Sequence, residues 1–117
     1  MNIENIKFKA KSLNSGKWIE GDLIRQSNGI YIRRHKNLSV IVDASTVCQF
    51  TGLKDKNGTS IYEGDIVMHK DNNAERIGNI NWDSKAAAFC FGQDFLVHYP
   101  SEDMVVIGNK FDKENSI

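Results

Sequence analysis

The chain has 117 residues, with 15 basic and 15 acidic side chains, and hydrophobic residues make up 40% of it. This length is the usual size of one domain, and this composition excludes a chain that is disordered throughout. No apolar stretch is long enough to span a bilayer, and the N-terminus lacks the basic and apolar regions of a signal peptide. We therefore expect a cytoplasmic protein that does not act at a membrane.

The charges are segregated along the chain. Residues 1–58 carry ten basic and five acidic side chains, whereas residues 59–117 carry five basic and ten acidic ones. We favour the interpretation that the two halves pack together with interleaved charges, because surface charge mainly serves solvation. The alternatives are a basic side for an anionic partner and a homo-oligomer in which unlike halves meet and close a ring.

The first 44 residues have the pattern of strands. Ile6, Phe8 and Ala10 alternate with lysines, which is the period of a half-buried strand. Residues 18–24 are rich in strand-forming side chains, and Asn28-Gly29 is a strong hairpin signal because both residues tolerate a positive φ. Residues 5–34 are thus predicted to form a three-stranded antiparallel meander, followed by a short strand at 39–42.

The rest of the chain is also predicted to be β-structure. Residues 45–50 are expected to form one helical turn that Gly52 ends, and residues 55–58 a tight turn. Strands are expected at 61–62, 65–70, 76–82, 87–91, 95–99 and 104–107. We predict an all-β protein in which an N-terminal meander (1–44) is joined by a connecting segment (45–60) to a small SH3-like barrel (61–117), all in one compact unit.

The centre of the chain contains a recognisable signature. Residues 43–67 read DASTVCQFTGLKDKNGTSIYEGDIV. This stretch closely resembles the signature of the YopX family of bacteriophage and prophage proteins, although Cys48 stands where a small residue such as glycine is expected. The opening strands and the late Val106-Ile107-Gly108-Asn109 are similar to that family as well. The resemblance implies an all-β fold with an SH3-like barrel and action in the cytoplasm of a bacterial host; the family's function is unknown, so no site residue carries over.

No catalytic or cofactor motif is present in the sequence. His35, His69 and His98 lie in separate segments without metal-ligand spacing, so we expect surface histidines and no metal or other cofactor. Cys48 and Cys90 belong to no CxxC motif and are expected to be buried, free thiols. A further set of carboxylates in the signature segment could converge, but each has a turn or capping role, so we expect a protein that is not an enzyme; these are Asp43, Asp55, Glu63 and Asp65.

Binding is the remaining class of function. The leading hypothesis is a phage-encoded, non-catalytic accessory module that binds a protein of the host or the phage through the polar loop at 49–62. The candidate contact residues are Gln49, Thr51, Lys54, Asp55 and Tyr62. The simpler interpretation is that Phe50 and Leu53 fill the core and that this loop only joins two subdomains.

The alternative hypothesis is a β-barrel protein that binds nucleic acid. Its candidate contacts are the basic residues around the first hairpin, namely Arg25, Arg33, Arg34 and Lys36. The sequence pI of about 6.8 argues against it, because a protein that neutralises many phosphates usually carries a net positive charge. The same residues would also serve to protect a hairpin edge from unwanted pairing.

Overall fold

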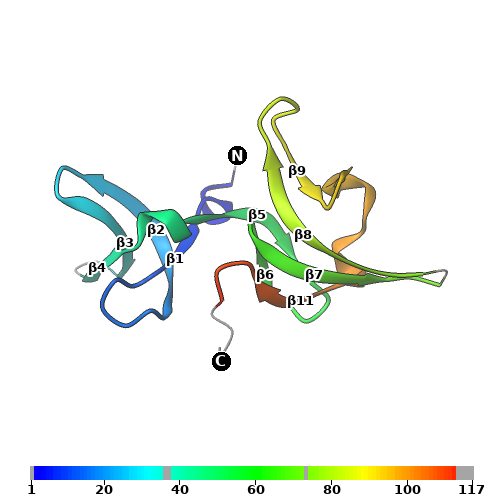
Figure 1. Ribbon diagram of the computed structural model, residues 1–117, viewed down its shortest axis with the longest axis horizontal. Coiled ribbons are helices and arrows are strands. Elements are labelled where there is room, and N and C mark those ends of the chain that lie inside the picture. Colours follow the sequence, from blue (N-terminus) through cyan, green and yellow to red (C-terminus); the bar gives the residue numbers. More distant parts are fainter. Residues whose placement is uncertain (1, 36–37, 73, 113–117) are drawn as a thin grey trace. The chain divides into compact units, whose positions relative to one another are not determined.

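The computed structural model describes residues 2–35, 38–72 and 74–112, and antiparallel strands dominate them (Figure 1). The all-β prediction is confirmed. The chain divides into two compact units, residues 1–50 and 51–117, and the division falls inside the segment that we predicted to be a connection. In the described ranges, every helical segment is a single 3-10 turn of three residues, and none is long or apolar enough to cross a bilayer.

The first unit is the predicted meander. Its elements are η1 (Ile3–Asn5), β1 (Phe8–Lys11), β2 (Trp18–Gln26), β3 (Gly29–His35), β4 (Leu38–Val42), η2 (Ala44–Thr46) and the beginning of β5 (Cys48–Lys54). The strands are ordered β4-β3-β2-β1-β5. Ala10 lies opposite Ile19 and Leu23 opposite Ile32, so alternate residues of these strands face a core centred on Ala10, Ile32 and Val42.

The prediction of a helical turn at 45–50 is correct only for its beginning. The 3-10 turn η2 ends at Thr46, and β5 starts two residues later. The Thr46 hydroxyl accepts a hydrogen bond from the Lys11 N–H, and Cys48 lies opposite Lys9. Pairing with β1 therefore extends the backbone where we expected it to coil. Gly52 does not end an element either, since β5 passes through it at a φ of 91°.

The second unit holds the remaining strands. Its elements are the end of β5, β6 (Ser60–Tyr62), β7 (Asp65–Lys70), β8 (Glu75–Asp83), β9 (Ala88–Phe91), β10 (Asp94–Phe95), η3 (Leu96–His98), η4 (Ser101–Asp103) and β11 (Met104–Asn109). One sheet has the order β10-β9-β8-β7-β11, and β6 is the neighbour of β5. The core consists of Ile61, Val67, Ile80, Phe91, Leu96 and Met104.

The strand predicted at 95–99 is wrong in most of its length. Only Phe95 belongs to a strand, and the chain then turns through η3, where the Tyr99 N–H donates to the Leu96 carbonyl at 3.0 Å. The turn directs Leu96 into the core, where it is almost fully buried. Burial of one leucine thus outweighs the strand preference of its aromatic and β-branched neighbours.

The barrel of the second unit is broadly SH3-like, but continuous strand pairing does not close it. Instead, the tight turn after β5 reaches the free edge of β11. The Lys56 N–H donates to the Met104 carbonyl at 3.0 Å, and the Val106 N–H donates to the Asp55 carboxylate at 2.9 Å. This turn therefore forms hydrogen bonds with backbone groups at the edge of β11 that would otherwise be open to pairing with another strand.

Candidate functional site: an apolar groove in the second unit

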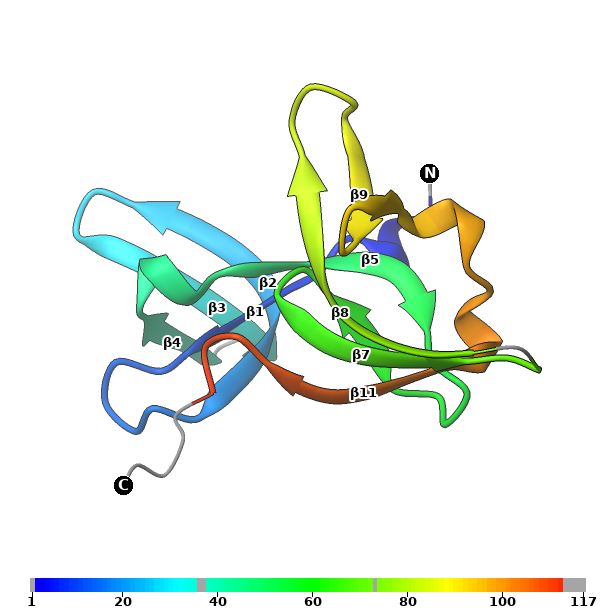
Figure 2. The same cartoon turned by 45° about the vertical axis from the view of Figure 1, so that its right-hand side comes forward.

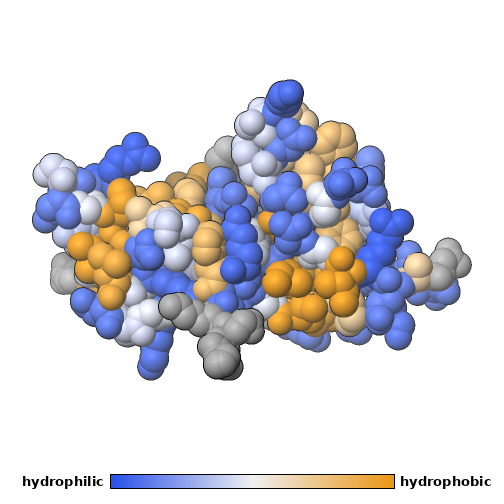
Figure 3. All heavy atoms as spheres, viewed as in Figure 1, coloured by the Kyte–Doolittle hydropathy of each residue, from blue (hydrophilic) through white to orange (hydrophobic). Residues whose placement is uncertain are grey.

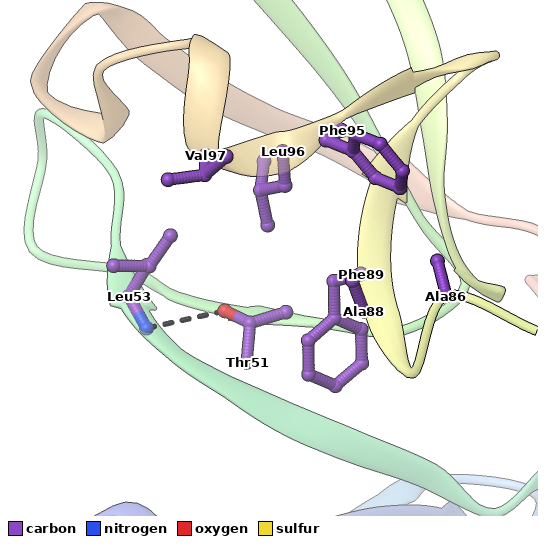
Figure 4. Close-up of a pocket in the computed structure, with 8 residues that line it drawn as sticks. All are labelled: Thr51, Leu53, Ala86, Ala88, Phe89, Phe95, Leu96 and Val97. Carbon is purple, nitrogen blue, oxygen red and sulfur yellow. Dashed lines mark hydrogen bonds between the residues drawn. The ribbon is translucent and has the colours of Figure 1, made fainter. Parts of the chain in front are cut away.

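The second unit contains an open, apolar groove of about 520 Å³. Its walls come from the end of β5, from β9 with the turn before it, and from β10 and η3 (Figure 4). The lining residues are Thr51, Leu53, Ala86, Ala88, Phe89, Phe95, Leu96 and Val97. A volume of this size falls in the range of ligand-binding clefts, and the lining has no charged side chain.

One wall of the groove is formed by the β8–β9 hairpin, which extends beyond the core residues at its base. Ile80 lies opposite Phe91 in the core, and the next pair on the same face, Trp82 and Phe89, lies beyond it. Figure 2 shows the β8–β9 hairpin extending well beyond β7 and β11. The Trp82 and Phe89 rings meet edge to face at a centroid distance of 5.0 Å, so they hold each other in place while both stay partly exposed.

The floor and the opposite wall are formed by Leu96 and β5. Leu96 belongs to the core and points from η3 toward the space between Leu53 and Phe89 (Figure 4). The Thr51 hydroxyl donates to the Ile61 carbonyl at 2.8 Å and accepts from the Leu53 N–H at 3.1 Å. The one side-chain hydroxyl of the lining is therefore engaged within the protein, which leaves the groove with an apolar surface.

The charges near the groove favour an anionic neighbour. Lys54 follows Leu53 and Lys85 precedes Ala86 in the chain; both are exposed, and in the described residues neither is paired with a carboxylate. Asp94, which precedes Phe95, is neutralised locally. Its carboxylate accepts from the Tyr99 hydroxyl at 2.6 Å and lies 3.6 Å from the Arg76 guanidinium. The Asp83 carboxylate accepts from the N–H groups of Lys85 and Ala86, so the rim carries both signs. The basic side chains near the groove outnumber these two acids, although the unit as a whole is acidic.

Tyr99 is held in its protonated form by this arrangement. The hydrogen bond to Asp94 raises the pKa of Tyr99 above its usual range, burial adds to this effect, and the Arg76 charge opposes it. A tyrosine with a raised pKa is a poor proton acceptor and a poor nucleophile at neutral pH. The cluster beside the groove ties Asp94 of β10 to Arg76 of β8 through Tyr99.

The five residues predicted to contact a protein partner have different environments. Thr51 lines the groove and Lys54 lies exposed beside it, while Gln49 is exposed on the part of β5 that belongs to the first unit. Asp55 and Tyr62 are buried, and the Asp55 carboxylate accepts from the backbone N–H groups of Asn57, Thr59 and Val106. The groove thus brings together two of the five.

The basic residues of the nucleic-acid hypothesis do not share one face. Arg33 lies opposite Asp22 and donates to the Ser39 hydroxyl at 3.4 Å, whereas Arg25 lies opposite Ile30 on the other face of the hairpin. Arg34 is exposed at a bulge between Arg33 and His35. Lys36 lies outside the described residues. Arg25 and Arg33 therefore lie on opposite faces of the hairpin, and the nucleic-acid hypothesis stays a prediction.

The carboxylates of the signature segment serve the backbone. Asp43 caps η2 by accepting from the Ser45 hydroxyl and N–H, and these bonds lower the pKa of Asp43. Asp65 is fully buried and accepts from the Tyr62 N–H at 2.7 Å. Glu63 is half-buried, and these acids do not meet in one site. Within residues 2–35, 38–72 and 74–112, no group of three metal-ligating side chains comes together.

The expectation of surface histidines is wrong for His69. This side chain is 3% exposed and packs against the rings of Phe91 and Tyr99, with centroid distances of 6.3 and 5.2 Å. The strand alternation of β7 directs it inward beside Val67. His98 is exposed as expected, and the His35 side chain lies outside the description. Both cysteines are buried thiols outside any disulfide, as predicted.

Sequence reasoning missed most of the groove. Phe89, Phe95 and Val97 were assigned to strands without any role, because their side chains converge with Leu53 only after the chain folds. One signal was available: Val97 and Trp82 are large apolar residues next to polar ones, and both prove to be well exposed. An exposed apolar cluster is more informative about function than any of these residues alone.

The family of the chain follows from comparison with known proteins. No curated protein matches it. The family model described as YopX protein matches residues 1–116, nearly the whole chain. The resemblance seen in the signature segment is therefore confirmed, and this chain belongs to the YopX family.

Proposed function

We propose that this chain is a non-catalytic binding module that takes an apolar, acidic segment of a partner protein into the groove of its second unit. The observation that carries the proposal is the groove itself, which has an apolar lining with its one hydroxyl already engaged. Such a surface gains free energy by removing apolar side chains from water and offers nothing to orient a polar metabolite.

The shape and charge of the groove favour a polypeptide as its occupant. An open groove of about 520 Å³ holds a few side chains of a segment that continues beyond it at both ends. The groove is lined by the exposed ring of Phe95 and the half-buried ring of Phe89, and aromatic rings are the kind of anchor that dominates protein interfaces. Lys54 and Lys85 then favour carboxylates on the flanks of the segment.

The proposal extends to origin and location. Membership of the YopX family, with its resemblance to bacteriophage and prophage proteins, supports a phage-encoded accessory protein that acts on a host or phage protein in the bacterial cytoplasm. Two buried cysteines that form no disulfide suit such a reducing compartment. The absence of catalysis is supported by Asp43, Asp55 and Asp65 of the signature segment, because the carboxylate of each accepts a hydrogen bond from a backbone N–H group.

The test is selection of random 12-residue displayed peptides against the immobilised full chain (about three helical turns or an extended reach of ~40 Å). Recovered peptides are synthesised with a fluorophore, and their affinities are measured by anisotropy. We expect peptides that combine leucine or aromatic residues with aspartate or glutamate. Their charge-reversed twins, with lysine in place of each acid, are expected to bind more weakly and to show the opposite salt dependence.

Variants assign the binding to the groove. Val97→Asp changes a side chain that is 84% exposed, so the fold is preserved, yet it places a carboxylate where apolar contact is needed. We expect it to weaken binding about tenfold or more, a difference of ~1.4 kcal/mol. Ile3→Asp is the matched control, because Ile3 is 77% exposed and belongs to the first unit, outside this groove. Equal binding by the Val97→Asp variant, or selection of peptides without apolar residues, would overturn the proposal.

A further inference from the structure

A second surface of this unit is apolar without being hollow. On β7, Val67 and His69 point into the core, so Ile66 and Met68 lie on the opposite, outer face. Cross-strand pairing places Val105, Met68 and Ile77 in one row over β11, β7 and β8. Figure 3 shows apolar side chains gathered over β7 and β11 on the face turned to the viewer.

This outer face is exposed to an unusual degree. Ile77 is 64% and Ile107 is 52% exposed, while Ile66, Met68 and Val105 are half-buried. The solvent face of an antiparallel sheet is ordinarily polar, and contiguous apolar patches on protein surfaces mark interaction sites. The face is distinct from the groove, because none of its five residues lines it.

We infer that this outer face, defined by Ile66, Met68, Ile77, Val105 and Ile107, packs against the same face of a second copy of this chain. The row Val105–Met68–Ile77 carries no charge, so it meets its own copy without repulsion. Two pleated sheet faces pack well on each other, with interdigitating side chains about 10 Å apart. A two-fold axis makes one patch both halves of the interface.

The charges at the ends of the face select one orientation of that axis. Lys70 lies opposite Glu75 at one end, whereas Asn79, Ile66 and Gly108 form an uncharged row at the other. A two-fold axis that runs along β7, the central strand of the face, would set Lys70 against its own copy. An axis across the strands sets the charged end over the uncharged end and Met68 over Ile66, which avoids contact between like charges.

The proposed contact differs from the charge-driven ring that the segregated sequence allows, and salt distinguishes them. Association through apolar side chains persists or strengthens as ionic strength rises, whereas attraction between basic and acidic halves is screened. A three-stranded patch is small for a protein interface, so the association is expected to depend on concentration and to exchange rapidly.

The experiment is sedimentation equilibrium of the full chain from about 10 μM to about 1 mM, at low salt and at about 1 M NaCl. We expect the average mass to rise from the monomer value of 13.2 kDa toward twice that value, with no loss at high salt. Ile77→Asp and, separately, Ile107→Asp are expected to keep the chain monomeric over this range, because each buries a carboxylate in the contact.

Two controls make the outcome specific to this face. Val97→Asp in the groove and Ile3→Asp on the first unit add the same charge at exposed apolar positions elsewhere, and both should associate like the natural chain. A monomer at every concentration, or a dimer that survives both Ile77→Asp and Ile107→Asp, overturns the inference. Loss of the dimer at high salt does so as well, because it points to contact between the charged halves.

Discussion

The Asp65 carboxylate accepts a hydrogen bond from the side-chain amide of Asn109 at 2.9 Å, and both residues are buried. Asp65 also accepts from the Tyr62 N–H. These contacts join two segments that carried the family resemblance, the Ile-Tyr-Glu-Gly-Asp stretch at the start of β7 and the Val-Ile-Gly-Asn stretch at the end of β11. These two parts of the family resemblance are thus explained by the architecture of the second unit.

Asp65→Ala should destabilise the second unit. The substitution leaves the Tyr62 N–H and the Asn109 amide in the interior without the carboxylate they donate to, and each unsatisfied donor costs about 1–3 kcal/mol. We expect a loss of about 2–5 kcal/mol in the free energy of unfolding, measured by urea denaturation. Glu102→Ala, at an exposed acid in η4, is the control and should change stability little. Equal effects of the two substitutions would contradict this role of Asp65.

Asp55 should make stability depend on acidic pH. Burial acts to raise the pKa of Asp55, but hydrogen bonds from the N–H groups of Val106, Thr59 and Asn57 outweigh it and lower the pKa. A carboxyl whose pKa is lowered by folding stabilises the protein above its ordinary pKa of about 3.9, and that stabilisation is lost as the pH falls through the folded value.

Asp55→Asn removes this titration and also the acceptor for Val106. We expect the variant to be less stable at neutral pH by about 1–3 kcal/mol and to lose less stability than the natural chain between about pH 5 and pH 2. Thermal unfolding followed by circular dichroism across this range measures both effects. Parallel curves for the two proteins would show that Asp55 is not the responsible group.

Gly21 should be indispensable to the first unit. A Cβ at this position of β2 would overlap the Arg33 carbonyl oxygen of β3, and backbone on the neighbouring strand cannot move aside. We expect Gly21→Ala to lower the free energy of unfolding by about 3 kcal/mol. Gly108→Ala, where the nearest atom is the Asp112 carboxylate at 3.6 Å, is the matched control and should cost far less.

Ala87 should tolerate glycine unusually well. It has a φ of 53° in the turn of the β8–β9 hairpin, in the left-handed region that costs other L-residues about 1–2 kcal/mol. Ala87→Gly is therefore expected to stabilise the chain by about 0.5–1 kcal/mol, and Ala86→Gly, one residue earlier, to destabilise it slightly. A higher melting temperature for the Ala86→Gly variant than for the Ala87→Gly variant would contradict this account.

Alternation and turn residues were sufficient to predict most of the fold. The β2–β3 hairpin, the turn at Asp55 and the strands around Ile80 and Phe91 lie where the sequence pattern indicates them. The errors have local causes. Cys48 extends because β1 offers it a partner strand, and Leu96 leaves its predicted strand because the core has a place for it. Tertiary contacts determine the conformation at both Cys48 and Leu96, and a local sequence pattern carries no information about such contacts.

The groove was harder to predict than the fold. The role of the acids in capping and turns follows from residue type, and Asp43 and Asp55 were placed correctly on that basis. The convergence of Leu53, Phe89 and Val97 depends on how far the β8–β9 hairpin extends past the core and on the turn at η3. Neither feature is encoded in a short motif, so the site is recognised only in the folded structure.

The most direct measurement of the central claim is a ¹⁵N–¹H NMR titration of the full chain with an acidic, apolar peptide obtained by selection. The account predicts that amide shifts concentrate on Thr51, Leu53, Phe89 and Val97, and that Val97→Asp abolishes them at the same peptide concentration. Shifts centred on the arginine-bearing β2–β3 hairpin, or a titration unchanged by Val97→Asp, would contradict it.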